Sequence, residues 1–151
     1  MGAMVPLVFL TLAPVRYVTY GNARYGFFLE RPTFLMPQRA PDNGDGREFR
    51  SGAIVLCAYG EMNTDGATAA SVLQGLRGEA KGGKVSLAVT KDGWCALSYT
   101  KGGMVFYDKT FVGKETMRTV QFEYPVTETT RMAPVVTRVV RSFHPTPVTT
   151  P

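Results

Sequence analysis

The sequence predicts an α+β fold, with a curved antiparallel sheet of about six to seven strands flanked by two helices. Short aromatic and β-branched runs follow one another between glycine-containing turns, as in serial hairpins. Helical periodicity occurs in only two places, midway along the chain and near its end. With 151 residues, of which 44% are hydrophobic and 19% charged, the composition is that of an ordinary globular protein. We therefore expect one domain over residues 16–143.

The first fifteen residues are predicted to stand apart from this domain. Val5 to Val15 form an apolar run that is too short for a bilayer span of about 20 residues but suited to the core of a signal peptide. Because no Lys or Arg precedes the run, residues 1–15 are interpreted as the remnant of a signal segment or as residues added by an expression vector. The alternative is a strand packed on the domain. We expect no transmembrane anchor and a periplasmic or secreted location, with the cytoplasm as the alternative.

The N-terminal half is expected to contain four strands. Residues 16–20 and 25–30 are rich in aromatic and β-branched side chains and flank a Gly-Asn turn. Residues 37–46 contain two prolines and two Asn/Asp-Gly dipeptides, which predict a loop closing a hairpin because glycine supplies positive φ. Strands are expected to resume over residues 47–51 and 53–60.

A first helix is predicted over residues 65–79, where the pattern changes to helical spacing. The residues that carry this spacing are Ala69, Val72, Leu73 and Leu76. Asp65 or Thr64 is expected to cap the first turn, and Gly78 to end the helix.

The C-terminal half is expected to contain further hairpins and a second helix. Strands are predicted over residues 85–90, 94–100, 104–112 and 115–124, the last with Val120, Phe122 and Tyr124 facing the core. The second helix is marked by an apolar stripe of Met132, Val135, Val136, Val139 and Phe143, opposite Arg131, Arg138 and Arg141. Residues 144–151 are expected to form a flexible tail.

The two cysteines offer little redox or metal chemistry. Cys57 and Cys95 lie far apart in the sequence and form no CxxC motif, and the sole histidine, His144, lies in the predicted tail. We expect no metal site and no cofactor. Each cysteine lies in an apolar run, where it acts either as a small buried hydrophobe or as half of a single disulfide in an oxidising compartment.

The polar residues form no recognisable catalytic set. His144 lies beside Pro145, a poor place for a rigidly held base, and the acids fall mostly at turns and strand ends. Asp42 to Gly46 is glycine-rich and acidic but lacks the spacing of a calcium loop, so a hairpin is the preferred interpretation. The protein is therefore predicted not to be an enzyme.

The formal charge of +5 comes from scattered cations rather than from a basic groove. We expect no nucleic-acid partner, because phosphate binding needs several converging cations. The aromatic residues are numerous, and those on outward sheet faces predict a partner surface that includes Phe28, Tyr59, Tyr99 and Tyr107. The alternative is that the second helix or the N-terminal segment covers this face.

Several segments resemble a family of uncharacterised exported bacterial proteins. They are Tyr25-Gly26-Phe27 with the proline after its strand, the hairpin Asn43 to Phe49, the strand ending Tyr59-Gly60, and the closing helix Val135 to Phe143. The similarity spans residues 18–143 and implies a PsbP/Mog-type α/β/α sandwich with a tendency toward binding roles. It implies no catalytic residues.

Two functional hypotheses follow from these observations. The first is a non-catalytic binding or accessory protein of the bacterial cell envelope, acting through contact with an unknown protein or an anionic envelope component. Immunity, inhibitor and chaperone roles all belong to this class. The second is a small carboxylate-dependent hydrolase acting on an envelope substrate, which would need two acids in a concave pocket.

Overall fold

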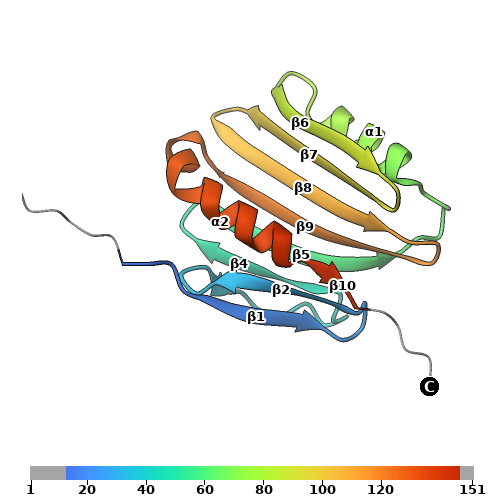
Figure 1. Cartoon of the computed structure of the whole chain (residues 1–151), viewed down its shortest axis with the longest axis horizontal. Helices are drawn as coiled ribbons and strands as arrows, with labels where there is room; N and C mark the ends of the chain where they lie inside the picture. The colour runs from blue at the N-terminus through green and yellow to red at the C-terminus, as the bar shows by residue number, and fades with distance from the viewer. Residues whose placement is uncertain (1–12, 147–151) are drawn as a thin grey trace, which may run out of the picture.

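The computed structural model describes residues 13–146 and contains two antiparallel sheets and two helices (Figure 1). The larger sheet has seven strands in the order β3-β4-β5-β9-β8-β7-β6, and the smaller has three in the order β1-β2-β10. The elements are β1 (Tyr17–Asn22), β2 (Phe27–Pro32), β3 (Met36–Pro37), β4 (Gly46–Ser51), β5 (Ile54–Met62), α1 (Ala69–Glu79), β6 (Lys84–Lys91), β7 (Trp94–Lys101), β8 (Met104–Val112), β9 (Thr116–Pro125), the 3-10 turn η1 (Val126–Glu128), α2 (Thr129–Ser142) and β10 (His144–Pro145). The predicted α+β class with an antiparallel sheet is confirmed.

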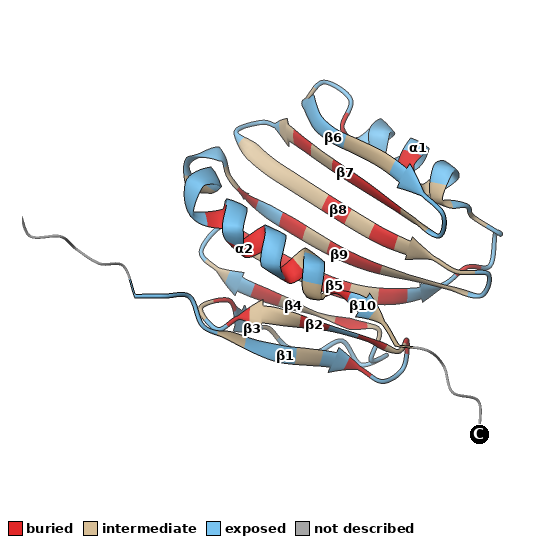
Figure 2. Cartoon of the chain, in the orientation of Figure 1, coloured by how far each residue is buried: buried red, intermediate tan, exposed pale blue. Residues whose placement is uncertain are grey.

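The main core lies between one face of the large sheet and a layer formed by α2 and the small sheet. The central strands contribute Leu56, Val120 and Phe122, each no more than 2% exposed. Phe143 follows α2, and its ring lies 5.6 Å from that of Phe27 in β2. Figure 2 shows α2 buried toward the sheet and exposed outward. The predicted inward orientation of Val120, Phe122 and Tyr124, and the predicted apolar stripe of α2, are confirmed by their burial.

A smaller core forms where α1 packs on the opposite face of the large sheet. Leu73 is the buried residue of the helix, and it packs with Cys95, Leu97 and Tyr99 of β7. The cap differs from the prediction, because the side chain of Thr68 accepts the hydrogen bond from the Ser71 backbone N–H at 3.1 Å. The helix therefore begins later than the sequence pattern indicated.

The two helices cover different halves of the large sheet. α1 contacts β6, β7 and β8, whereas α2 contacts β9 of that sheet and β2 of the small one. They also lie on opposite faces, because α1 packs on the side chains of Leu97 and Tyr99, and α2 on those of Val120 and Phe122 (Figure 1). Each face therefore keeps one half without a helix.

Two short strands were missed by the sequence analysis, and one of them corrects the predicted tail. His144 and Pro145 form β10, paired with Phe28 and Phe27 of β2, so the domain continues past residue 143. β3 pairs with β4 at the other side of the predicted loop. Strands of two residues carry no detectable period, and only their long-range pairing defines them.

The first turn also differs from its prediction. The strand runs through Gly21 to Asn22, and the reversal falls at residues 23–26, where Gly26 has φ of 61°. Asn22 fixes this turn, since its Oδ1 accepts from the Tyr25 backbone N–H at 2.9 Å. The predicted signal-like run falls largely outside the described residues. Among residues 13–146, no helix combines the length and the hydropathy needed to cross a bilayer.

Candidate functional site

The half of the α2-side face that α2 does not reach forms a surface that we call the Trp94 face. Paired residues of neighbouring strands share a sheet face, and Tyr107 and Lys109 pair with the inward-facing Phe122 and Val120. The pairing of β6, β7 and β8 extends this face outward in a grid of three residues by three. Its members are Leu87, Val89 and Lys91 of β6, Trp94, Ala96 and Ser98 of β7, and Tyr107, Lys109 and Phe111 of β8.

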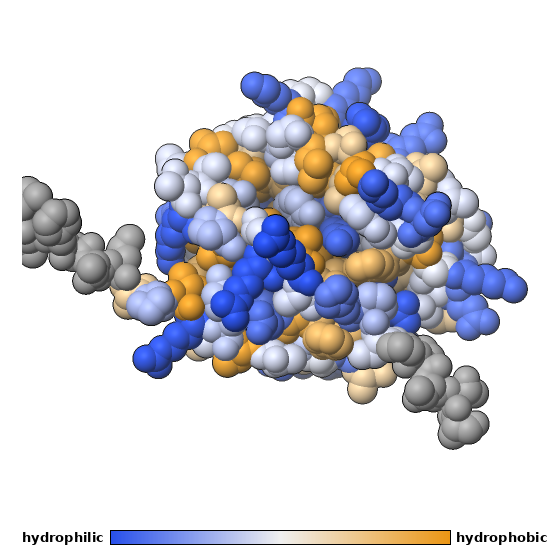
Figure 3. Space-filling model, in the orientation of Figure 1, coloured by the Kyte–Doolittle hydropathy of each residue, from blue (hydrophilic) through white to orange (hydrophobic). Residues whose placement is uncertain are grey.

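The Trp94 face is apolar at its centre and carries cations but no acid. Leu87 is 40% exposed, and Ala96 on the middle strand lies beneath its larger neighbours at 1% exposure. Figure 3 shows orange apolar side chains over these strands, with blue polar ones around them. Contiguous apolar patches at the surface of a folded protein mark contact sites, so this face is the candidate surface for a partner.

Lys109 is the unusual residue of this face. Its half-buried ammonium lies 4.4 Å from the ring centroid of Trp94 and 5.0 Å from that of Phe111. Within the described residues, no carboxylate forms an ion pair with it. Burial lowers the pKa of the Lys109 ammonium, which means that aromatic faces replace only part of the water that the charge has lost.

The other open half, on the α1-side face, is polar, and we call it the Asp108 face. Glu48, Cys57, Gln121 and Asp108 follow one another across four strands. Asp108 is 5% exposed and accepts a hydrogen bond from Gln121 Nε2 at 2.6 Å. Burial raises the pKa of Asp108 to about 6. In the next row, the hydroxyls of Thr110 and Thr119 lie 2.9 Å apart.

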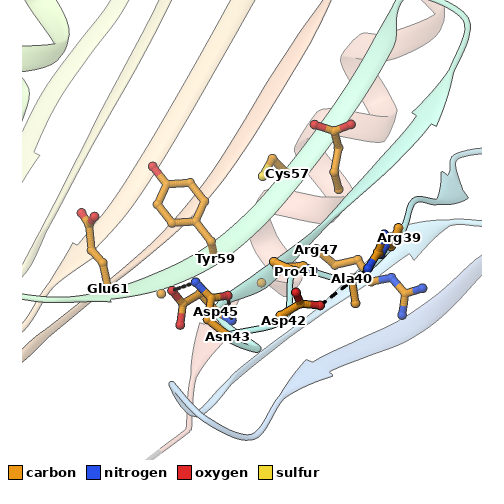
Figure 4. Close-up of a pocket in the computed structure, with 13 residues that line it drawn as sticks. Arg39, Ala40, Pro41, Asp42, Asn43, Asp45, Arg47, Cys57, Tyr59 and Glu61 are labelled. Atoms are coloured by element: carbon orange, nitrogen blue, oxygen red, sulfur yellow. Dashed lines mark hydrogen bonds and ion pairs between the residues drawn. The ribbon is translucent and has the colours of Figure 1, made fainter.

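An open depression of about 630 Å³ lies at the edge of the Asp108 face, between β5 and the loop of residues 38–45. Figure 4 shows Tyr59 and Cys57 projecting from β5 above loop residues Asp42, Asn43 and Asp45. Burial raises the pKa of Tyr59 to about 12 and that of Cys57 to about 11, so both are neutral and poorly nucleophilic near pH 7.

The loop beside this depression is tied to the β1–β2 turn. Arg24 Nη1 lies 2.7 Å from Asp45 Oδ1, and Asn22 Nδ2 donates to the Gly44 carbonyl at 2.8 Å. Asn43 Nδ2 donates to Asp45 Oδ2 at 2.6 Å. The oxygens that gave the loop its calcium-like appearance thus serve contacts within the protein. Among residues 13–146, no group of three metal-ligating side chains occurs.

A second depression, of about 660 Å³, lies between α2 and β2. Arg138, which lines this depression, already has partners within the protein. Its Nε lies 3.0 Å from Glu30 Oε2, and its guanidinium lies 4.1 Å from the Tyr17 ring centroid. Arg131 lies two helical turns before Arg138 on the same side of α2, and its guanidinium lies 4.7 Å from the ring centroid of Phe34. These arginines attach α2 to the chain segment that contains the small sheet.

The four aromatic residues predicted as a partner surface do not come together. Tyr107 belongs to the Trp94 face, whereas Tyr59 lies on the Asp108 face. Tyr99 is 5% exposed under α1 and stacks on Phe106 at 4.8 Å, and Phe28 lies on the small sheet, 39% exposed. Sequence reasoning missed Trp94 and Lys109. The alternation of Tyr107, Lys109 and Phe111 along one strand was a signal that these three share a face, whereas Trp94 joins them only through the register of β7 with β8.

The two cysteines are free thiols in the structure. Cys57 lies in β5 and Cys95 in β7, with β9 and β8 between them. Three strand spacings amount to roughly 14 Å, far beyond the ~4.4–6.8 Å between Cα atoms that a disulfide spans. In the structure the two cysteines are therefore separate thiols, Cys95 buried and Cys57 partly buried.

Comparison with known proteins identifies the fold. No protein-family model and no curated protein matches the chain. Among solved structures, the chain is similar to cyanobacterial PsbP (CyanoP) from Synechocystis sp. PCC 6803, with a TM-score of 0.61 and 15% identity over 95% of this chain and 99% of that one. It is also similar to LpqN, described as involved in cell envelope biogenesis of Mycobacterium tuberculosis, with a TM-score of 0.58 and 17% identity over 88% of this chain and 92% of that one. The PsbP-like fold implied by the sequence resemblance is thereby confirmed.

Proposed function

We propose that this protein is a non-catalytic accessory protein of the bacterial cell envelope, periplasmic or secreted, that binds a protein partner through the Trp94 face. The observation that carries the proposal is the three-by-three grid around Trp94, which lies on the side of β6, β7 and β8 opposite α1 and has a half-buried cation at its edge. Tryptophan and tyrosine in partly desolvated surroundings are the residues most often responsible for binding energy at protein interfaces.

One of the similar solved structures supports the envelope setting. One similar structure is of a protein described as involved in cell envelope biogenesis, and another is of a cyanobacterial PsbP. Immunity, inhibitor and chaperone roles would all use a contact of this kind.

The hydrolase hypothesis receives less support. It needs two carboxylates in one cleft, with one of them protonated near neutral pH. Asp108 has a raised pKa, but it is not among the residues that line the depression at the edge of its face.

The proposal is tested by site-specific photo-crosslinking in the native bacterium. A photoreactive residue replaces Leu87 on the Trp94 face or, as a matched control, Val18 on the small sheet; the two side chains are 40% and 41% exposed. We expect one discrete adduct from position 87, none of that mass from position 18, and its loss when Trp94→Ala is added.

Two results would overturn the proposal. One is the same set of adducts from both positions, or none from position 87. The other is turnover of a cell-wall or ester substrate that disappears in Asp108→Asn, because it would establish a catalytic function.

A further inference from the structure

We infer that the partner covers the Trp94 face with an amphipathic helix whose apolar side carries one acidic residue, and that this carboxylate binds the ammonium of Lys109. The inference rests on the proposed function and specifies the chemistry of the partner. It follows from the state of Lys109, the shape of the face and the charges around it.

Lys109 has no anionic partner among residues 13–146, the part of the chain that the structure describes. Its ammonium has lost water to the surrounding Trp94 and Phe111 rings, and no carboxylate of the described residues pairs with it. A partner that covered the face with apolar groups alone would remove the remaining water and leave a buried unpaired charge, which is strongly unfavourable. A partner that supplies a carboxylate gains a desolvated, charge-assisted hydrogen bond.

The dimensions of the face fit a helix. Three strands span two spacings of about 4.8 Å, roughly 10 Å in all, which matches the diameter of an α-helix. The middle strand offers the small residues Ala96 and Ser98, flanked by the larger Trp94, Lys109 and Tyr107 on the same face. On the reverse side of the same three strands, α1 already packs in this manner.

Two other occupants fit less well. A strand added to the edge of β6 would meet a register shift between Val85 and Leu87, and lysines at both ends of the strand, features that discourage edge pairing. A second copy docked face to face would place Lys91 and Lys109 of each protomer against the cations of the other.

The test uses two synthetic, stapled helical peptides of about fifteen residues. Each has leucines along one side, and they differ only in a central Glu or Gln among those leucines. Trp94 is the single tryptophan of the chain, so its fluorescence reports binding directly. We expect the Glu peptide to bind at least about tenfold more tightly than the Gln peptide, as for a hydrogen bond between charged groups.

Variants assign the preference to Lys109. In Lys109→Met the Glu preference should disappear, and in Lys109→Arg it should persist. Lys114→Met, at an exposed turn position, should behave as the wild type. Circular dichroism and thermal melting establish whether each variant is folded. If Lys109→Met does not fold, Lys109→Arg still decides the test.

Equal binding of the two peptides, binding of neither, or a Glu preference that survives Lys109→Met would overturn the inference. A peptide with the sequence of residues 1–12 that binds as tightly as the Glu peptide would also overturn it, because the Trp94 face would then bind the N-terminal segment of this chain. If the peptides fail while position 87 still captures its partner, the proposed function stands and this inference falls. If the peptides behave as expected but no adduct forms in cells, the site stands and the proposed function falls.

Discussion

Asp108 and Lys109 are neighbours in β8, yet their charges do not neutralise each other. Side chains of consecutive strand residues point to opposite faces, so Asp108 lies on the polar face and Lys109 on the apolar one. Each ion is desolvated, and neither forms an ion pair within the described part of the chain. Two such groups reduce the stability of the free protein, a cost typical of positions that serve binding.

The cost of Asp108 depends on pH. Its folded-state pKa rises from 3.8 to about 6, so the folded protein binds this proton more tightly than the unfolded chain does. The penalty is absent below pH 4, grows between pH 4 and 6, and is complete above pH 6, where it corresponds to roughly 3 kcal/mol. Asp108→Asn should therefore raise the free energy of unfolding by about 2–3 kcal/mol at pH 7.5 and change it little at pH 3.5.

Urea unfolding at the two pH values measures this effect. Asp92→Asn, at an exposed turn, serves as the control and should not show the same pH-dependent gain. A gain in Asp108→Asn that is equal at both pH values would show that charge burial is not its cause.

At the scale of elements, two glycines should respond to alanine in opposite directions. A Cβ on Gly60 of β5 would lie 2.1 Å from the ring of Tyr25, whereas one on Gly75 of α1 meets nothing within 4 Å. Gly60→Ala should cost about 1–3 kcal/mol through overpacking. Gly75→Ala should gain about 0.5–1 kcal/mol, because glycine is unfavourable inside a helix. Thermal and denaturant unfolding check both changes, and a loss at Gly75 would contradict the open surroundings of that position.

Most elements were predictable because their signals are local. The alternation that turns Val120 and Phe122 inward is visible in the sequence, and so is the helical spacing around Leu73. The cap was misplaced at Thr64 or Asp65 because several residues before α1 have suitable side chains. Only the fold shows that Thr68 has the extended backbone and the hydrogen bond of a cap.

The candidate site was harder to predict than the elements. Tyr107 was predicted to belong to a partner surface, but Trp94 and Lys109 were not. Which half of a sheet face remains open depends on where each helix packs, and that placement is set by contacts between distant residues. The Glu30 backbone N–H, for example, donates to Ser142 Oγ, 112 positions away.

At the scale of the whole molecule, we expect unequal local stability, because α1 and α2 cover different halves of the large sheet. β5 and β9 lie inside the large sheet and carry fully buried residues such as Leu56 and Val120, whereas β6 is an edge strand and α1 buries one residue. Native-state hydrogen exchange should be slowest in β5 and β9 and faster by orders of magnitude in β6 and α1. Uniform protection across the sheet would contradict this expectation.

The pairing of β10 with β2 also shapes how the protein is made. Phe27, near the start of the chain, packs against Phe143, which the ribosome adds 116 positions later. At about 5–20 residues per second, the first hairpin waits on the order of ten seconds for the segment that completes its sheet. Until Phe143 and β10 have been made, the apolar side of this hairpin lacks the residues that cover it in the folded protein.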